Sequence, residues 1–260
     1  MQEPNPMQNQ PYQPPYMPPA KRGRGFRALI IVLVLLLAAG IVMQSPLFRV
    51  ERVLVAGNVN LSEGYIVERS GLNPGQNMFS VNKEEVEKSV NADRFLVFEG
   101  LEKDYATRTV TLYIYERVPV ATLQTLGIQY ELDCMGYVLD QSESLSLVDG
   151  LLVLTGLKAE ACILGRPVQA ESRAQLNAYQ SVMYELNALN CVSLISELNV
   201  LDMGNLYLVS ADGMAVRLGE PTQVHAKMIA FLTVKEQLDL MGKTGGTVDV
   251  SIPVYPVYIP

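Results

Sequence analysis

The 260-residue sequence predicts an α+β protein with a single amino-terminal transmembrane helix, then a β-α-α-β-β domain, then a mixed, β-rich domain with helices. Three observations support this fold class. An uncharged apolar run lies near the amino terminus. After it, short stretches alternate apolar and polar residues as strands do, and others space apolar residues three or four apart as helices do. The predicted divisions are a disordered cytoplasmic tail (1–27), the membrane helix (28–47), a first domain (48–117) and a second domain (118–260).

The amino-terminal tail has the composition of a segment that does not pack. Residues 1–20 contain seven of the 15 prolines. Such a segment cannot bury a core and is expected to be disordered. The net charge of the chain is −7, and residues 1–27 carry +3, so residues 28–260 carry −10. An acidic folded part argues against a nucleic-acid partner, because a duplex requires a basic face.

The apolar run extends from Ala28 to Met43, and with its flanks it approaches the ~20 residues that a membrane-spanning helix needs. A cleaved signal peptide is the alternative, with residues 38–40 as the cleavage site. The run continues beyond that site into a strand pattern, which favours an uncleaved anchor. Lys and Arg accumulate on the cytoplasmic flank of a span. The segment "KRGRGFR" therefore predicts a single-pass cell-membrane protein with a cytoplasmic amino terminus and its bulk, after Gln44, outside.

The first domain begins with a strand and a short helix. Val50–Val55 alternates as a partly buried strand. Gly57 and Asn58 then form a turn, because both residues tolerate positive φ. Ser62 is a favourable amino-terminal cap for the helix that follows, and Gly71 is placed to end it.

The same domain continues with a second helix and two strands. A turn at Gly75 precedes a helix that Asn82 caps, and extended segments follow over 95–103 and 109–120. Pro119 is assigned to the turn that leaves this domain. A three-stranded sheet with both helices on one face would bury the apolar stripe of each helix.

The second domain is predicted from a hairpin, further strands and two longer helices. Residues 128–140 form the hairpin, with Asp133 opening its turn and Gly136 closing it. Residues 172–189 space their apolar side chains as a helix does. The remaining predicted elements are a strand at 151–157, three strands between 196 and 220, a helix from about Thr222 and a closing strand at 247–255.

The sequence offers no catalytic constellation. Its one histidine, His225, lies inside a helical pattern, and no nucleophile motif accompanies it. Cys134, Cys162 and Cys191 form no C-x-x-C pair, and their number is odd, so neither a zinc site nor a disulfide framework is expected. The three cysteines are interpreted as small apolar residues. We therefore expect no enzyme activity, no catalytic or metal-binding residue, no cofactor and no small-molecule substrate.

Several strings resemble one protein family. They are "VAGN" at 55–58, "SGLNPGQNMF" at 70–79 and "ERVPVA" at 116–121, placed just after the anchor. This part resembles the POTRA (polypeptide-transport-associated) domain of the FtsQ/DivIB cell-division proteins. "GMAVRLGE" (213–220), "AKMIAFLTVKEQL" (226–238) and "GTVDVSIPVY" (246–255) resemble the β domain of the same family.

The resemblance implies a role in the bacterial divisome at the division septum. It implies a non-catalytic, membrane-anchored scaffold that binds FtsB/DivIC-like and FtsL-like single-pass proteins and helps to localise and regulate septal peptidoglycan synthesis. A partner is expected to add a strand to an exposed sheet edge. The residues proposed for that edge are Thr247, Val248, Asp249, Val250, Ser251 and Ile252.

A second interpretation keeps the POTRA resemblance and changes the function. POTRA units also act as chaperones or polypeptide-transport components in outer-membrane insertases. Those proteins place a membrane barrel after the POTRA units. Here only about 140 residues follow, and they contain helices and no series of ~10-residue amphipathic strands. The scaffold is therefore favoured.

Overall fold

The computed structural model describes residues 24–144, 148 and 150–260. The predicted disordered tail falls mainly on residues 1–23, outside the described residues. The chain forms two compact units, Met1–Arg49 and Val50–Pro260.

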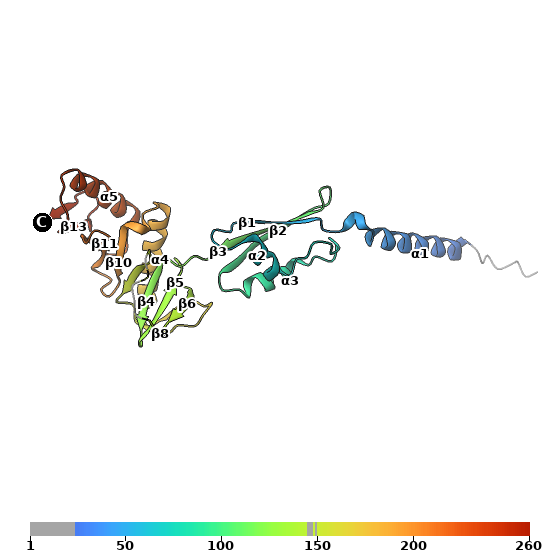
Figure 1. Ribbon diagram of the computed structural model, residues 1–260, viewed down its shortest axis with the longest axis horizontal. Helices are drawn as coiled ribbons and strands as arrows, with labels where there is room; N and C mark the ends of the chain where they lie inside the picture. Colours follow the sequence, from blue (N-terminus) through green and yellow to red (C-terminus); the bar gives the residue numbers. More distant parts are fainter. Residues whose placement is uncertain (1–23, 145–147, 149) are drawn as a thin grey trace, which may run out of the picture. The chain divides into compact units, whose positions relative to one another are not determined.

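The first unit contains one long apolar helix, α1 (Arg24–Met43), drawn in blue in Figure 1. By length and composition, its residues Gly25–Met43 could cross a membrane. The helix begins and ends four residues earlier than the predicted span of 28–47. Its early end has a local cause. Ser45 is extended, as the residue before a proline tends to be, and Pro46–Phe48 then forms a short 3₁₀ helix, η1.

The second unit begins with an amino-terminal lobe, Val50–Glu116, whose element order is the predicted one. Within the described residues this lobe has a three-stranded sheet of order β1-β3-β2, in which β1 runs parallel to β3 and β2 antiparallel to it. Its elements are β1 (Arg52–Ala56), α2 (Glu63–Ser70), α3 (Lys83–Asn91), β2 (Leu96–Asp104) and β3 (Thr109–Glu116).

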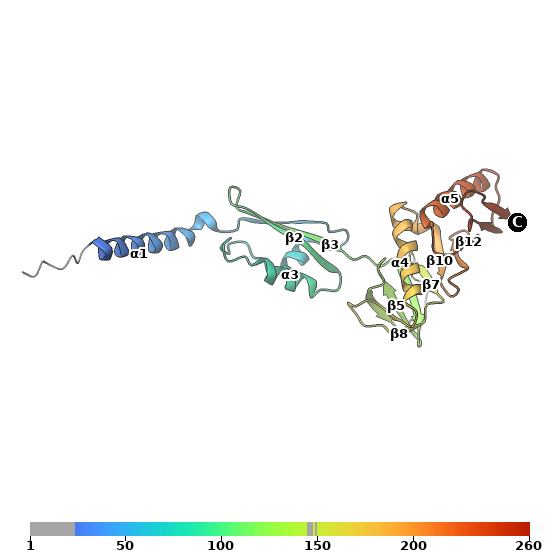
Figure 2. The ribbon, with the colours of Figure 1, turned by 180° about the vertical axis from the view of Figure 1, so that it is seen from behind.

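Both helices of this lobe pack on one face of its sheet (Figures 1 and 2). Their caps confirm the sequence interpretation. The Ser62 hydroxyl accepts a hydrogen bond from the Tyr65 N–H at 3.3 Å, and the Asn82 side chain accepts one from the Glu84 N–H at 3.0 Å. Gly71 ends α2 with φ of 73°. The packing buries Ile66 of α2.

The carboxy-terminal lobe, Ala121–Ile259, is built on one mixed sheet. In the described residues this sheet has nine strands in the order β14-β13-β12-β11-β10-β7-β4-β5-β6. The strands are β4 (Ala121–Thr125), β5 (Ile128–Leu132), β6 (Val138–Ser142), β7 (Leu152–Thr155), β10 (Ile195–Asn199), β11 (Leu206–Ser210), β12 (Ala215–Gly219), β13 (Thr247–Asp249) and β14 (Val257–Ile259). A separate small ribbon pairs β8 (Ala159–Ala161) with β9 (Gln169–Ala170).

Two long helices complete the core of this lobe. They are α4 (Arg173–Ala188) and α5 (Val224–Leu240), with a 3₁₀ turn η2 (Val192–Leu194) between α4 and β10. The helical spacing predicted for 172–189 is confirmed, since Tyr179 and Met183 of α4 are fully buried. The β5–β6 hairpin also forms as predicted, with Asp133 and Gly136 in its turn.

The closing strand differs from the prediction. One strand was expected over 247–255, but β13 ends at Asp249, the chain turns, and β14 returns antiparallel to β13. The turn begins because the Asp249 carboxylate accepts hydrogen bonds from both the N–H and the hydroxyl of Ser251, at 2.9 and 2.6 Å. Pro253 and Pro256 then supply no N–H to a continuing ladder.

Candidate partner-binding surfaces

The six residues proposed as a docking edge do not form an edge strand. β13 lies between β12 and β14, so its backbone is paired on both sides. Of the six, Thr247, Val248 and Asp249 belong to β13, and the other three lie in the turn that follows. Val248 and Val250 are fully buried. The expectation that this segment is an exposed edge was therefore wrong. The signal in the sequence was Pro253 and Pro256, which separate β13 from a further strand, β14.

The outer strand at this end of the sheet is β14, which has no neighbour on its far side among the described residues. Its backbone orientation follows from the hydrogen bonds of β13. The Val250 N–H, just after β13, donates to the Arg217 carbonyl of β12 at 3.0 Å. The backbone N–H and C=O groups of even-numbered residues in this segment therefore point to β12, and those of odd-numbered residues point to β14. Asp249 pairs with Val257, which directs the backbone groups of Tyr258 outward.

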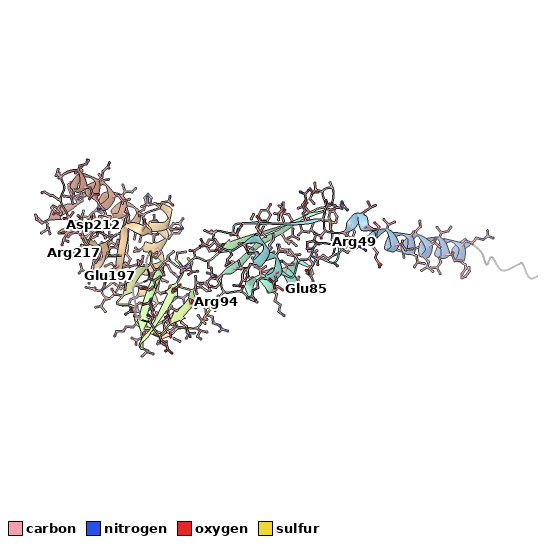
Figure 3. All side chains as sticks on the ribbon, viewed as in Figure 1. Arg49, Glu85, Arg94, Glu197, Asp212 and Arg217 are labelled. Atoms are coloured by element: carbon pink, nitrogen blue, oxygen red, sulfur yellow. The ribbon has the colours of Figure 1, made fainter. Side chains whose placement is uncertain are left out.

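Apolar side chains surround this outward edge. Val257 and Ile259, on β14 itself, are 52% and 53% exposed. The turn before β14 adds further exposed apolar side chains, those of Ile252, Val254 and Tyr255. An outer strand with unpaired backbone groups and exposed apolar side chains is the arrangement to which another chain can add a strand. Figure 3 shows Arg217 of β12 toward the same end of the lobe.

The opposite edge of the sheet, β6, is less suited to this role. The loop at Gly165 and Arg166 already pairs with its first residue, since the Gly165 N–H donates to the Val138 carbonyl and the Val138 N–H to the Arg166 carbonyl. The rest of β6 exposes Asp140, Gln141 and Ser142, which are polar. The two edges therefore differ in both pairing and polarity.

The turns predicted from sequence hold the amino-terminal lobe together. Gly57 has φ of 99°, and a Cβ at this position would overlap the Ile114 carbonyl oxygen. The Asn58 amide donates to the Leu61 carbonyl at 3.0 Å. Gly75 has φ of 91°, and its N–H donates to the Val50 carbonyl at 2.7 Å. Pro119 lies in the segment between β3 and β4.

Glu116, the first residue of the string 116–121, anchors the loop that follows Asn58, and this role was not predicted. Its side chain is 4% exposed, and its carboxylate accepts hydrogen bonds from the backbone N–H groups of Val59, Asn60 and Leu61 at 2.6–3.2 Å. A charged acceptor with three N–H donors is strongly stabilised. The last residue of β3 thereby fixes the loop between β1 and α2.

The next residue, Arg117, connects the two lobes. Its guanidinium is 2.5 Å from the Asp133 carboxylate, which is 1% exposed, and stacks 3.6 Å from the centre of the Tyr137 ring. Asp133 also accepts from the N–H groups of Met135 and Tyr137, and its carbonyl accepts from the Tyr179 hydroxyl at 2.7 Å. Burial raises the pKa of Tyr179 well above its ordinary value, so this hydroxyl remains a donor.

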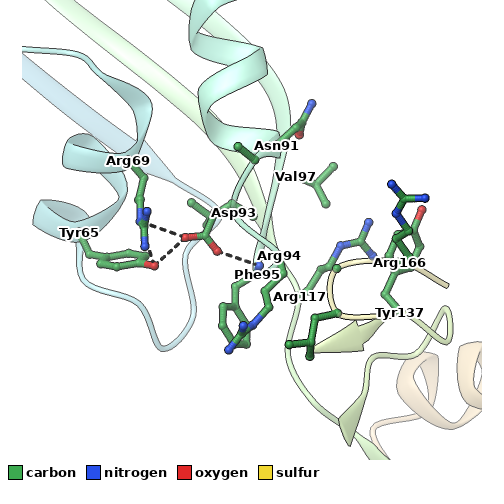
Figure 4. A pocket seen from close by; sticks show the side chains of 14 residues that line it. Tyr65, Arg69, Asn91, Asp93, Arg94, Phe95, Val97, Arg117, Tyr137 and Arg166 are labelled. Atoms are coloured by element: carbon green, nitrogen blue, oxygen red, sulfur yellow. Dashed lines mark hydrogen bonds and ion pairs between the residues drawn. The ribbon is translucent and has the colours of Figure 1, made fainter. Parts of the chain in front are cut away.

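A cleft of about 910 Å³ opens beside Arg117 (Figure 4). Residues of both lobes line it: Tyr65, Arg69 and the segment 91–97 from the amino-terminal lobe, and Tyr137 and 164–166 from the carboxy-terminal lobe. Four of the lining residues are arginines, and sequence reasoning missed them because they are spread between positions 69 and 166.

The surroundings of His225, Cys162 and Cys191 are those of ordinary packing and surface residues. The His225 Nδ1 lies 2.7 Å from a carboxylate oxygen of Glu185 at an exposed position. Burial raises the pKa of the Cys162 and Cys191 thiols, so both stay protonated and are poor nucleophiles. Within the described residues, no three His, Cys, Asp or Glu side chains are grouped to hold a metal ion.

Comparison with known proteins agrees with this architecture. A family model described as "POTRA domain, FtsQ-type" matches residues 48–96, and one described as "Cell division protein FtsQ/DivIB, C-terminal" matches residues 121–251. The chain is 20% identical over 248 residues to "Cell division protein DivIB" of Clostridium botulinum, covering 94% of each chain. It is 27% identical over 236 residues to "Cell division protein FtsQ" of Myxococcus fulvus, covering 86% of this chain and 80% of the relative.

The two models match in the order and at the places where the structure has its two lobes. The FtsQ/DivIB carboxy-terminal model alone covers half of the chain. The chain therefore belongs to the FtsQ/DivIB family of cell division proteins.

Proposed function

We propose that this protein is a non-catalytic, membrane-anchored scaffold of the divisome. It binds FtsB/DivIC-like and FtsL-like proteins and helps to localise and regulate septal peptidoglycan synthesis. Membership in the FtsQ/DivIB family supports a role in cell division. The observation that carries the scaffold proposal is the outer edge of β14, with outward backbone groups and exposed apolar side chains.

The proposal places the amino terminus in the cytoplasm and the two lobes outside. The basic segment before α1 supports this orientation, because Lys and Arg favour the cytoplasmic flank. The lobes and their partners would then meet on the outer side of the membrane, where septal peptidoglycan is made.

Binding is proposed to occur by strand addition at β14. A partner strand would hydrogen-bond to the outward backbone groups of Tyr258 and cover the side chains of Val257 and Ile259. Residues Thr247 to Ile252 would contribute indirectly, because β13 and the turn hold β14 in place.

The test combines Val257→Glu with Ile259→Glu in the full-length chain, co-expressed with the FtsB/DivIC-like protein of the same genome. We expect recovery of the partner in a pull-down to fall more than about tenfold, because desolvating an unpaired carboxylate costs several kcal/mol. Both side chains are exposed in the free protein, so circular dichroism should report an unchanged fold.

The matched control places the same two charges on the other edge, as Gln141→Glu with Ser142→Glu on β6. This variant should retain the partner. Loss of binding in the β6 variant, with retention in the β14 variant, would assign docking to the opposite edge. A fluorescent fusion of the unmodified chain should form a band at mid-cell, and a uniform membrane signal would contradict a septal role.

A further inference from the structure

The cleft between the lobes differs in charge from the rest of the folded chain. Its lining includes Arg69, Arg94, Arg117 and Arg166 against one acidic residue, Asp93, which gives +3. The excess is +1 when Asp133 and Asp140, which pair with Arg117 and Arg94 from outside the lining, are counted as well. Residues 28–260 as a whole carry −10. A local reversal of sign on an acidic protein concentrates anionic ligands. We propose that this cleft binds an extended acidic peptide segment of a partner protein, separately from the β14 edge.

Two of the four arginines are committed within the protein. Arg69 lies 3.2 Å from the Asp93 carboxylate, which also accepts from the Tyr65 hydroxyl at 2.6 Å. Arg117 is paired with the buried Asp133 carboxylate. These two arginines shape the cleft, and their carboxylate partners largely offset their charges.

The other two arginines keep hydrogen-bonding capacity for a ligand. The Arg94 Nη2 makes only a long hydrogen bond, at 3.5 Å, to the Asp140 carboxylate, and both side chains of this ion pair are partly exposed. No hydrogen bond or ion pair joins the Arg166 guanidinium to any described residue, and this side chain is exposed. Arginine is well suited to carboxylates, because its fork of donors can bind both oxygens.

The placement of these side chains indicates an extended ligand. Backbone packing brings their segments together, since Gly165 lies against the Cβ of Arg94. Figure 4 nevertheless shows the side chains of Arg94 and Arg166 pointing away from each other. One small anion cannot contact both guanidinium groups, whereas an extended segment with several carboxylates can.

The apolar part of the lining favours a peptide over a phosphate polymer. Val97 and Leu164 line the cleft beside the arginines, and the ring of Phe95 lies 4.9 Å beneath the Arg94 guanidinium. Peptide side chains can cover these apolar groups, whereas a phosphate chain has none to offer. A cavity of about 910 Å³ is also large enough for several side chains.

The probe is a phage-displayed library of random twelve-residue peptides, selected on the full-length protein in detergent. Selection on the Arg94→Gln, Arg166→Gln double variant is run in parallel. We expect peptides rich in Asp and Glu to be enriched on the unmodified protein and not on the double variant. An enriched peptide, labelled and measured by fluorescence polarisation, should bind about fivefold more weakly to each single variant, as for an exposed ion pair.

Arg173→Gln is the matched control, because it removes the same charge from an exposed position outside the cleft. It should leave binding within about twofold of the unmodified protein, because its side chain does not line the cleft. Equal losses in all three single variants would overturn the proposal, as would enrichment without acidic residues. Inorganic polyphosphate is the other arm. Cleft-dependent binding of polyphosphate without binding of acidic peptides would replace the peptide assignment by a phosphate polymer.

Failure of this experiment leaves the proposed scaffold function standing. The β14 variants do not alter the cleft, and the arginine variants do not alter the β14 edge. Loss of partner recovery in one set and loss of peptide binding in the other are therefore independent results.

Discussion

Gly57 and Gly75 of the amino-terminal lobe differ in how much space a side chain would have. Gly57 and Gly75 both have φ above 90°, where any side chain costs roughly 1–2 kcal/mol. A Cβ at Gly57 would also overlap the backbone of Ile114, whereas nothing lies within 4 Å of a Cβ at Gly75. We expect Gly75→Ala to cost about 1–2 kcal/mol and Gly57→Ala about 1–3 kcal/mol more, as overpacking does.

Urea unfolding of the full-length variants checks this difference. The chain has 13 tyrosines and no tryptophan, so tyrosine fluorescence and circular dichroism are the suitable probes. Gly75→Ala is the internal control, since it introduces the same backbone strain without the overlap. Equal losses of stability would mean that β3 moves to make room for the new methyl group.

Among the secondary-structure elements, α5 is joined to the β11–β12 turn by an ion pair. Lys235 of α5 lies 2.7 Å from Asp212 in that turn and 3.1 Å from Asp239 one helical turn on. Figure 3 labels Asp212 at this end of the carboxy-terminal lobe. Two hydrogen bonds lower the pKa of the Asp212 carboxyl below its ordinary value: the one from Lys235 has the larger effect, and the one from the Ser210 hydroxyl the smaller.

The lowered pKa makes the effect of Asp212→Asn depend on pH. A carboxyl group whose folded pKa is depressed contributes stability above its unfolded pKa of roughly 3.9, and that stability is lost as pH falls through the folded pKa. We expect Asp212→Asn to lower the free energy of unfolding by up to about 1 kcal/mol at pH 7, as for a partly exposed pair. The difference from the unmodified protein should shrink steadily as the pH is lowered below 4.

Urea titrations at several pH values measure this convergence. Glu236→Gln serves as the control, because Glu236 is an exposed acid on the same helix with no ion pair among the described residues. It should change stability little at any pH. A pH-independent loss in Asp212→Asn would show that the loss does not come from the negative charge of the Asp212 carboxylate.

For the whole molecule, the proposed orientation can be tested by labelling. In a background with Cys134, Cys162 and Cys191 replaced by Ala, single cysteines are placed at Gln8, Glu84 and Glu160. A membrane-impermeant thiol reagent should label the two lobe positions, both exposed, in intact cells. It should leave Gln8 unlabelled until the cells are permeabilised, because the basic flank of α1 favours a cytoplasmic amino terminus.

The pattern across the three sites is decisive. Labelling of Gln8 in intact cells, with protection of Glu84 and Glu160, would mean the reverse orientation. Protection of all three positions in intact cells, followed by labelling after permeabilisation, would place the lobes inside together with the amino terminus.

Local features were largely predictable from the sequence. Ser62, Gly71 and Asn82 mark helix ends because a cap acts through hydrogen bonds within about three residues of itself. The buried face of α4 followed from apolar spacing, and the Asp133 turn from its flanking strands. The family followed from the same local strings, which the two matching models then confirmed.

Long-range features could not be predicted in this way. The single strand expected over 247–255 became β13, a turn and β14, and this moved the sheet edge to the last residues of the chain. The role of Glu116 depends on a loop more than 50 positions earlier in the chain. The arginines of the cleft come from distant segments that only packing brings together.

The physical reason is the range over which each interaction acts. Caps, turns and apolar periodicity are settled between near neighbours, so the sequence alone determined the apolar amino-terminal helix and the element order of the amino-terminal lobe. Sheet order and surface charge depend on which distant segments pair once loops have closed and cores have packed. Only the tertiary structure therefore decided that β14, and not β13, is an outer strand of the described sheet and that four arginines share one cleft.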